Sequence, residues 1–142
     1  MKPRVWILLL AATALVSCGR QPDNTLLPQG LLAGEVVKVE IVSDFGPYKD
    51  RKKVILEKPD EIRALLAAGT LVKKEPCPCL HGEKVTFHTK EAKLVASICE
   101  HCFDIWKDGE VHNYSMPPEF YPLFQKHLDS PEAMVTPPRA KR

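Results

Sequence analysis

Short stretches in which apolar and polar residues alternate are the feature that most constrains how this chain can fold. In residues 35–43, Val37, Val39 and Ile41 share one side of an extended backbone, and charged residues occupy the other side. Alternation with a period of two is typical of a strand that buries one face. The other stretches predicted to form strands are 53–57, 84–89, 93–99 and 103–115, the last interrupted by a hairpin turn at Asp108-Gly109.

Two further segments have the periodicity of helices, and Pro59 and Pro117 mark where they begin. Gly69 suits the C-terminal end of the first. Their apolar residues recur at helical spacing: Ile62, Leu65 and Leu66 in the first, and Phe120, Leu123, Phe124 and Leu128 in the second. The order ββαβββα predicts an α+β domain, with an antiparallel sheet of about five strands and both helices packed on one face.

Four cysteines form two pairs that are far apart in the sequence: Cys77, Cys79, Cys99 and Cys102. The strands predicted between the pairs form a hairpin in which facing residues have numbers that sum to about 181. This register brings Cys99 opposite Gly82 and Cys102 opposite Cys79. We therefore expect all four cysteines to meet at the open end of one hairpin.

Three chemistries fit this cluster. In an oxidising compartment the cysteines form two disulfides, and adjacent strands favour 77–102 with 79–99, or 77–99 with 79–102, without any cofactor. The alternative is a metal site, because C-x-C followed after nineteen residues by C-x-x-C is near the spacing of a zinc ribbon. His81 and His101 lie beside the cysteines, and thiolates with imidazole suit zinc or copper. The third is thiol–disulfide exchange at Cys99 and Cys102, although their flanks are predicted strands rather than a helix N-terminus.

The N-terminal segment indicates export. Lys2 and Arg4 precede an apolar run over residues 5–16 that is too short to span a bilayer. The run ends in Leu15-Val16-Ser17-Cys18, which resembles the lipobox of bacterial lipoproteins. The resemblance implies that the preceding peptide is removed and that Cys18 is acylated, with palmitate among its acyl chains.

The residue after the acylated cysteine carries a further implication about the membrane. Gly19 resembles the sorting class of outer-membrane lipoproteins in Gram-negative bacteria. The expected location is therefore the cell envelope, and in such a bacterium the outer membrane facing the periplasm. The expected partners are the membrane itself, through the lipid, and an envelope protein.

Composition and periodicity together divide the chain into four predicted segments. We expect a signal peptide over 1–17, the lipidated Cys18 with a flexible tether over 18–34, the α+β domain over 35–129 and a disordered tail over 130–142. Removal of 1–17 brings the formal charge from +2 to 0, so charge gives no reason to expect nucleic-acid binding.

The chain contains no phosphate loop, nucleophile elbow or acidic metal loop, so the sequence favours a non-enzymatic protein. The leading interpretation is a lipid-anchored envelope protein whose domain is a disulfide-stapled binding or structural module. A metal-binding lipoprotein and a thiol–disulfide redox protein remain the alternatives.

Overall fold

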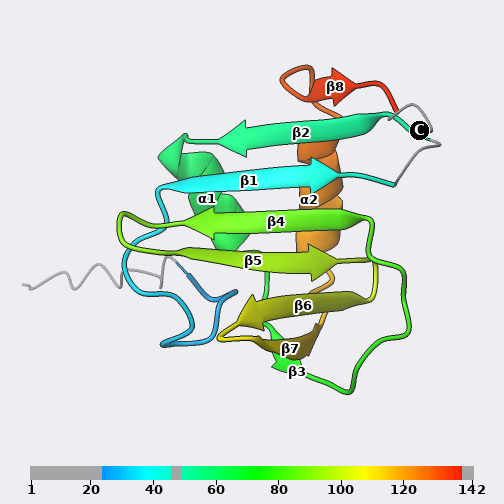
Figure 1. Cartoon of the computed structure of the whole chain (residues 1–142). Coiled ribbons are helices and arrows are strands. Elements are labelled where there is room, and N and C mark those ends of the chain that lie inside the picture. Colours follow the sequence, from blue (N-terminus) through cyan, green and yellow to red (C-terminus); the bar gives the residue numbers. More distant parts are fainter. Residues whose placement is uncertain (1–23, 46–48, 139–142) are drawn as a thin grey trace, which may run out of the picture.

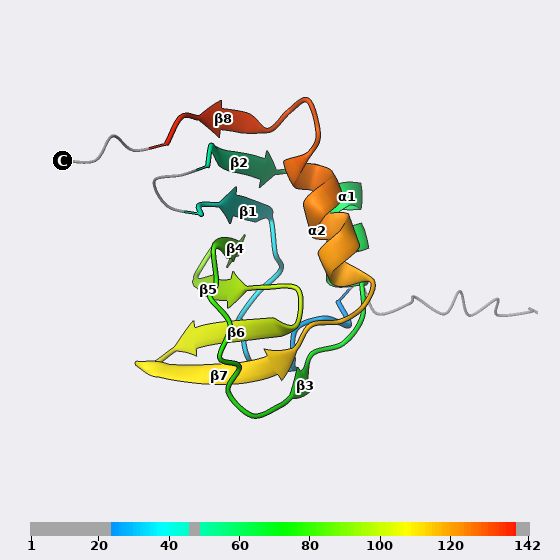
Figure 2. The ribbon, with the colours of Figure 1, turned by 90° about the vertical axis from the view of Figure 1, so that its right-hand side faces the viewer.

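The computed structural model describes residues 24–45 and 49–138. Its elements in chain order are β1 (Lys38–Ser43), β2 (Arg51–Leu56), α1 (Pro59–Leu66), β3 (Val72–Lys73), β4 (Glu83–His88), β5 (Lys93–Ile98), β6 (Cys102–Lys107), β7 (Glu110–Ser115), α2 (Phe120–Leu128) and β8 (Met134–Thr136). The strands form one sheet in the order β3-β7-β6-β5-β4-β1-β2-β8, with antiparallel neighbours throughout (Figure 1). Both helices pack on the same face of the sheet, and we call the opposite face the open face (Figure 2).

The predicted α+β class is confirmed, but the sheet is larger than predicted. The sequence predicts about five strands, and the described residues form eight. One reason is that the Asp108-Gly109 turn divides the predicted strand 103–115 into β6 and β7. Asp108 and Gly109 have φ values of 52° and 80°, as a two-residue hairpin turn requires. The other reason is that β3 and β8 are only two and three residues long, too short to show alternation.

Alternate residues of the strands face the helices and form the core. Phe87 on β4 and Phe103 on β6 are fully buried, and the Phe103 ring meets Phe120 of α2 edge-to-face at 5.3 Å between centroids. The predicted apolar stripes are largely confirmed, since the buried helix residues are Ile62, Leu65, Leu66, Phe120, Phe124 and Leu128. Leu123 differs from the prediction because it is only partly buried.

A flexible tether is predicted over 18–34, but the described part of that segment, residues 24–34, contacts the domain. Leu26 and Leu27 are buried. The N–H of Leu26 donates to the carbonyl oxygen of Leu66 at 2.9 Å, and the N–H of Leu71 donates to that of Leu26 at 3.2 Å. A disordered tail is predicted over 130–142, but its described part, residues 130–138, contains β8. In both segments the order comes from contacts with distant residues, which the Pro- and Gly-containing sequence does not reveal.

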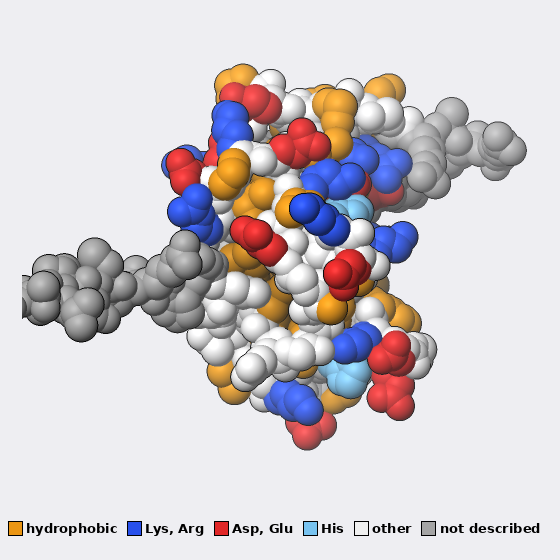
Figure 3. Space-filling view, turned by 90° about the vertical axis from the view of Figure 1, so that its left-hand side faces the viewer, with side chains coloured by type: hydrophobic (Ala, Val, Ile, Leu, Met, Phe, Trp, Pro, Cys, Tyr) orange, Lys and Arg blue, Asp and Glu red, His pale blue; other side chains and the backbone are white. Residues whose placement is uncertain are grey.

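Charged side chains of both signs share the surface. Figure 3 shows the end of the sheet that lies on the left in Figure 1, where Lys and Arg side chains lie beside Asp and Glu side chains. Neither sign dominates that side of the molecule. Among the described residues, no helix has both the length and the apolar composition needed to cross a membrane.

Candidate metal centre

The β4–β5 hairpin brings the two cysteine pairs to one end of the sheet. Glu83 pairs with Ile98, and Lys84 pairs with Ser97. This is the register predicted from the sequence, and it places Cys99 opposite Gly82 just beyond the last paired residues. The alternation of β4 and β5 explains the result, because a slip of one residue would turn their apolar side chains away from the helices.

Cys99 and Cys102 flank the turn that joins β5 to β6. Their backbones exchange two hydrogen bonds: the N–H of Cys99 donates to the carbonyl oxygen of Cys102 at 3.0 Å, and the reverse bond is 3.3 Å. Glu100 and His101 form the exposed tip of this turn. The C-x-x-C sequence is therefore part of a hairpin, whereas reactive pairs of this kind sit at a helix N-terminus.

The segment from Lys74 to Gly82, which connects β3 to β4, runs along the end of the sheet where β5 leads into β6 (Figures 1 and 2). The N–H of Lys74 donates to the carbonyl oxygen of Asn113 on β7 at 3.0 Å. At the other end, the N–H of Asp44 donates to the carbonyl oxygen of Gly82 at 2.7 Å. Because both ends are fixed, the cysteines between them are held over the Cys99–Cys102 turn.

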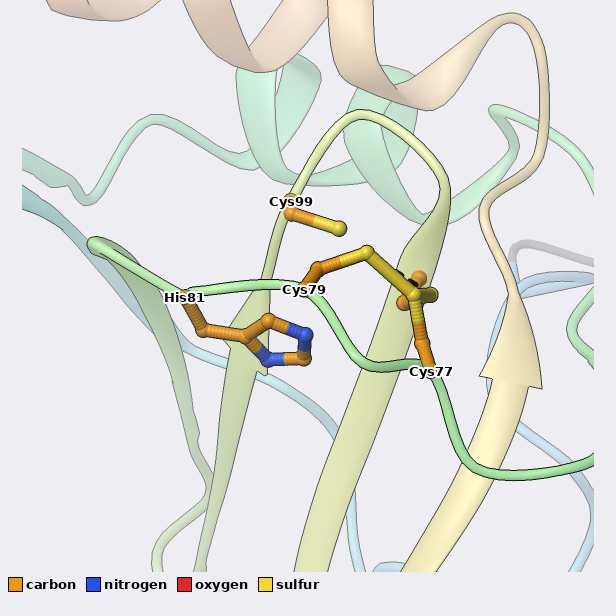
Figure 4. A group of neighbouring side chains, drawn as sticks. Cys77, Cys79, His81 and Cys99 are labelled. Carbon is orange, nitrogen blue, oxygen red and sulfur yellow. Dashed lines mark hydrogen bonds between the residues drawn. A yellow bond between two sulfur atoms is a disulfide. The ribbon is translucent and has the colours of Figure 1, made fainter.

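Five donor side chains meet at this point: Cys77, Cys79, His81, Cys99 and Cys102. Their ligand atoms all lie within 4.8 Å of one another. Figure 4 shows the side chains of Cys77, Cys79 and Cys99 converging, with the His81 ring beside them. Cys102 is fully buried on β6, and the other four are partly buried. We call these five residues the Cys/His cluster.

The contacts of Cys77 with two other cysteines cannot both be disulfides. The Sγ atom of Cys77 lies within bonding distance of the Sγ atoms of both Cys79 and Cys102. A divalent sulfur forms only one disulfide, so the two contacts are alternatives. Cys99 is not in a disulfide. The Cys77–Cys102 contact agrees with one bond of the predicted pairing 77–102 with 79–99, but the second bond of that pairing is not formed among the described cysteines.

His81 is oriented by a carboxylate. Its Nδ1 atom lies 3.4 Å from Oδ2 of Asp104. The other oxygen of Asp104 accepts a hydrogen bond of 2.8 Å from the side-chain amide of Asn113. The Nε2 atom of His81 is buried and has no hydrogen-bond partner. A histidine that binds a metal through one ring nitrogen usually directs the other to a carboxylate, and His81 has this arrangement.

A positive charge lies beside the buried sulfur. The Nζ atom of Lys74 is 3.5 Å from Sγ of Cys102. A neighbouring ammonium stabilises a thiolate relative to the neutral thiol. Lys74 therefore supplies a positive charge beside a sulfur that would carry negative charge when bound to a metal.

Two predicted site residues lie elsewhere. His101 is exposed in the β5–β6 turn and is not among the five residues of the Cys/His cluster. Cys18, the predicted lipidation site, lies outside the described residues. Asp104, Asn113 and Lys74 have contacts with the cluster that the sequence analysis did not identify.

Comparisons with known proteins do not assign a family. No family model matches the chain, and no curated protein matches it. A crystal structure described as that of a "Putative Lipoprotein from Clostridium perfringens" is similar with a TM-score of 0.47 and 17% sequence identity. The match covers 66% of this chain and 85% of that one. Similarity at this level assigns no function.

The chemistry of the cluster follows from its donors. It combines four sulfurs and one imidazole nitrogen within a small volume. Soft donors of this kind select zinc or copper(I) over magnesium or calcium, which prefer oxygen. The same sulfurs, when oxidised, can instead form one disulfide that includes Cys77. The arrangement therefore supports metal binding and disulfide formation as competing reactions.

Proposed function

We propose that this domain is a metal-binding module that holds zinc or copper(I) through the Cys/His cluster. His81 and three of the four cysteines would supply the ligands, since structural zinc sites are four-coordinate. The observation that carries the proposal is the buried, unpartnered Nε2 atom of His81, which lies beside four sulfurs while Asp104 orients the opposite side of the ring.

The energetic argument concerns that nitrogen atom. Leaving a buried polar group without a partner costs about 1–3 kcal/mol. The ring could avoid this cost by turning toward solvent, but its Nδ1 atom faces Asp104, which is itself held by Asn113. A metal ion supplies the missing partner for Nε2 and neutralises the neighbouring thiolates. Disulfide formation removes two thiolates but leaves Nε2 without a partner.

The spacing of two sulfurs agrees with a shared metal. Sulfurs bound to one tetrahedral zinc ion at about 2.3 Å lie about 3.8 Å apart. The Sγ atoms of Cys79 and Cys102 are 3.7 Å apart. Because these cysteines lie on different segments, a common ion would fix the 74–82 segment to β6.

Titration of the reduced chain with Co²⁺ tests this function. The protein, purified anaerobically with its thiols reduced, is expected to bind one Co²⁺ per chain with thiolate-to-cobalt charge-transfer bands and tetrahedral d–d bands. His81→Ala should weaken binding and change the d–d bands, because nitrogen is lost from the ligand set. His101→Ala is the matched control and should behave as the unmodified chain. A reduced chain without charge-transfer bands would contradict the proposal.

A disulfide-stapled module is the second candidate, favoured by the contact of Cys77 with Cys102. These residues are 25 apart in sequence, and in the chain-entropy model closing such a loop stabilises the fold by roughly 3–4 kcal/mol. The Co²⁺ titration also distinguishes a disulfide-stapled module from a metal-binding module. A stapled module takes up no Co²⁺ when reduced, and without reductant its mass is two hydrogens below the value calculated for free thiols.

We also propose that the domain is attached to the cell envelope through an acylated Cys18 and acts there by binding. The support is the lipobox resemblance of residues 15–18. Stable anchoring requires more than one acyl chain, which lipoprotein processing supplies. In a Gram-negative host, the Gly19 resemblance supports a location on the outer membrane, where the domain would face the periplasm and bind a protein partner there.

Metabolic labelling checks the anchor. Cells that express the full chain with labelled palmitate are expected to yield labelled protein in the membrane fraction. Cys18→Ala should abolish the label and leave the protein as an unprocessed precursor. Cys99→Ala, which removes a different thiol, should keep the label. Retention of the label in Cys18→Ala would show that the lipobox resemblance is misleading.

A further inference from the structure

We propose that Cys77 makes the metal site redox-gated, so that oxidation by a disulfide closes the site and releases the metal. This inference rests on the proposed function, because it concerns regulation of the same cluster. Its basis is that the backbone of Cys77 lies at disulfide-forming distance from two other cysteines of the cluster, Cys79 and Cys102. The same cysteine sulfurs can therefore bind a metal when reduced and form a disulfide when oxidised.

The backbone permits either disulfide. The Cα atoms of Cys77 and Cys102 are 6.4 Å apart, and those of Cys77 and Cys79 are 5.4 Å apart. Natural disulfides join residues whose Cα atoms are usually about 4.4–6.8 Å apart. Neither bond needs a rearrangement of the sheet. The choice between them depends only on which thiol reacts with Cys77.

Either disulfide removes two of the five donors. A Cys77–Cys102 bond leaves Cys79, His81 and Cys99, and a Cys77–Cys79 bond leaves His81 with two cysteines as well. Three donors do not complete a four-coordinate structural site. Reduction reverses the change, because thiols that are not bonded separate to ordinary contact distance and are again available as ligands.

Exposure suggests the order of the reaction. Cys77 and Cys79 are partly buried on the 74–82 segment, next to Leu80, which is 98% exposed, whereas Cys102 is 0% exposed. An external disulfide therefore reaches the segment first, and Cys102 lies behind Cys77. In this arrangement Cys77 reacts with the oxidant and Cys102 completes the exchange.

The exchange balances with a disulfide oxidant such as glutathione disulfide. The Cys77 thiolate attacks one sulfur of the oxidant, a mixed disulfide forms, and one glutathione thiolate leaves. The Cys102 thiolate then attacks the Cys77 sulfur of the mixed disulfide and expels the second glutathione thiolate. The two cysteines lose two electrons in total, the oxidant gains them, and the metal ion leaves with its charge unchanged.

The test uses the zinc-bound full chain, glutathione disulfide and a chromogenic zinc indicator. We expect one zinc ion to be released for each protein disulfide formed, with a mass loss of two hydrogens. Proteolytic mapping should find a peptide linked through Cys77 and Cys102. Addition of a dithiol reductant and zinc should restore the bound metal.

Two variants form a matched pair, because each keeps His81 and three cysteines. Zinc release is measured per zinc ion bound, and in Cys77→Ser it should no longer follow oxidation, since the shared sulfur is absent. In Cys99→Ser, oxidation should release the same fraction of the bound zinc as in the unmodified chain, whatever the affinity of the variant. Equal release from both variants would overturn the role of Cys77.

The remaining outcomes separate the two proposals. If the reduced chain binds no zinc, the proposed function fails before any oxidant is added. If the chain binds zinc and keeps it after a disulfide has formed, the redox gate is wrong while the metal site stands. If zinc leaves without a change in protein mass, the release is not coupled to oxidation, and the gate is again wrong.

Discussion

Asp104→Asn is expected to lower the affinity of the reduced chain for zinc by about 10- to 100-fold, the usual effect of removing the partner of a metal-bound histidine. Asp104 lies 3.4 Å from Nδ1 of His81. The substitution keeps the size of the side chain but removes the carboxylate charge that orients the imidazole and fixes its Nδ1–H tautomer. All five candidate ligands remain present, so the loss measures orientation of His81 alone.

Asp108→Asn is the control for this experiment. It makes the same chemical change on the same hairpin, but Asp108 is exposed in the β6–β7 turn. Its φ of 52° is one that Asn adopts readily. Zinc affinity, measured by competition with a chromogenic chelator, should be unchanged in this variant. Equal affinities of the Asp104→Asn variant and the unmodified chain would show that His81 is not a ligand.

The convergence of the cysteines could be predicted because it depends on strand register. Alternation in β4 and β5 fixes which residues face the helices, and the pairing of Glu83 with Ile98 follows from it. Cys99 continues that register beyond the last pair. Because alternation constrains every residue of both strands, it suffices to predict that side chains nearly twenty positions apart in the sequence lie close together.

The choice between the two histidines could not be made from the sequence. His81 lies two positions from Cys79 and His101 lies next to Cys102, so proximity along the chain does not favour His81. His101 occupies the tip of a two-residue turn, where its side chain is exposed, while His81 lies on a segment whose path is set by tertiary hydrogen bonds at Asn113 and Gly82. No periodicity over 74–82 indicates that path.

The positions of Asp104 and Asn113 near His81 could have been predicted from the sequence. Asp104 follows Cys102 by two positions on β6, so both side chains lie on the same face of the sheet. The turn at Asp108-Gly109 fixes Asn113 opposite Asp104. Counting from that turn would have placed a carboxylate and an amide beside the predicted cluster, but the sequence analysis did not use this register.

Gly69→Ala is expected to destabilise the fold by about 2–5 kcal/mol, combining roughly 1–2 kcal/mol of backbone strain with about 1–3 kcal/mol of overpacking. Gly69 follows the C-terminal end of α1 with a φ of 103°, a conformation that residues with a side chain rarely adopt. An added Cβ atom would lie 2.5 Å from Cβ of Pro117. Pro117 is buried ahead of α2, and its rigid ring cannot turn aside.

Gly109→Ala separates the two contributions. Gly109 also has a positive φ, 80°, but an added Cβ atom there would have no heavy atom within 4 Å. Its cost should therefore be the backbone strain alone, about 1–2 kcal/mol. Urea unfolding of both variants, with the metal and the thiols in the same state, gives the difference. A larger loss for Gly69→Ala means that the close approach of α1 to the segment before α2 holds the helical layer together, and equal losses would mean that this contact yields without cost.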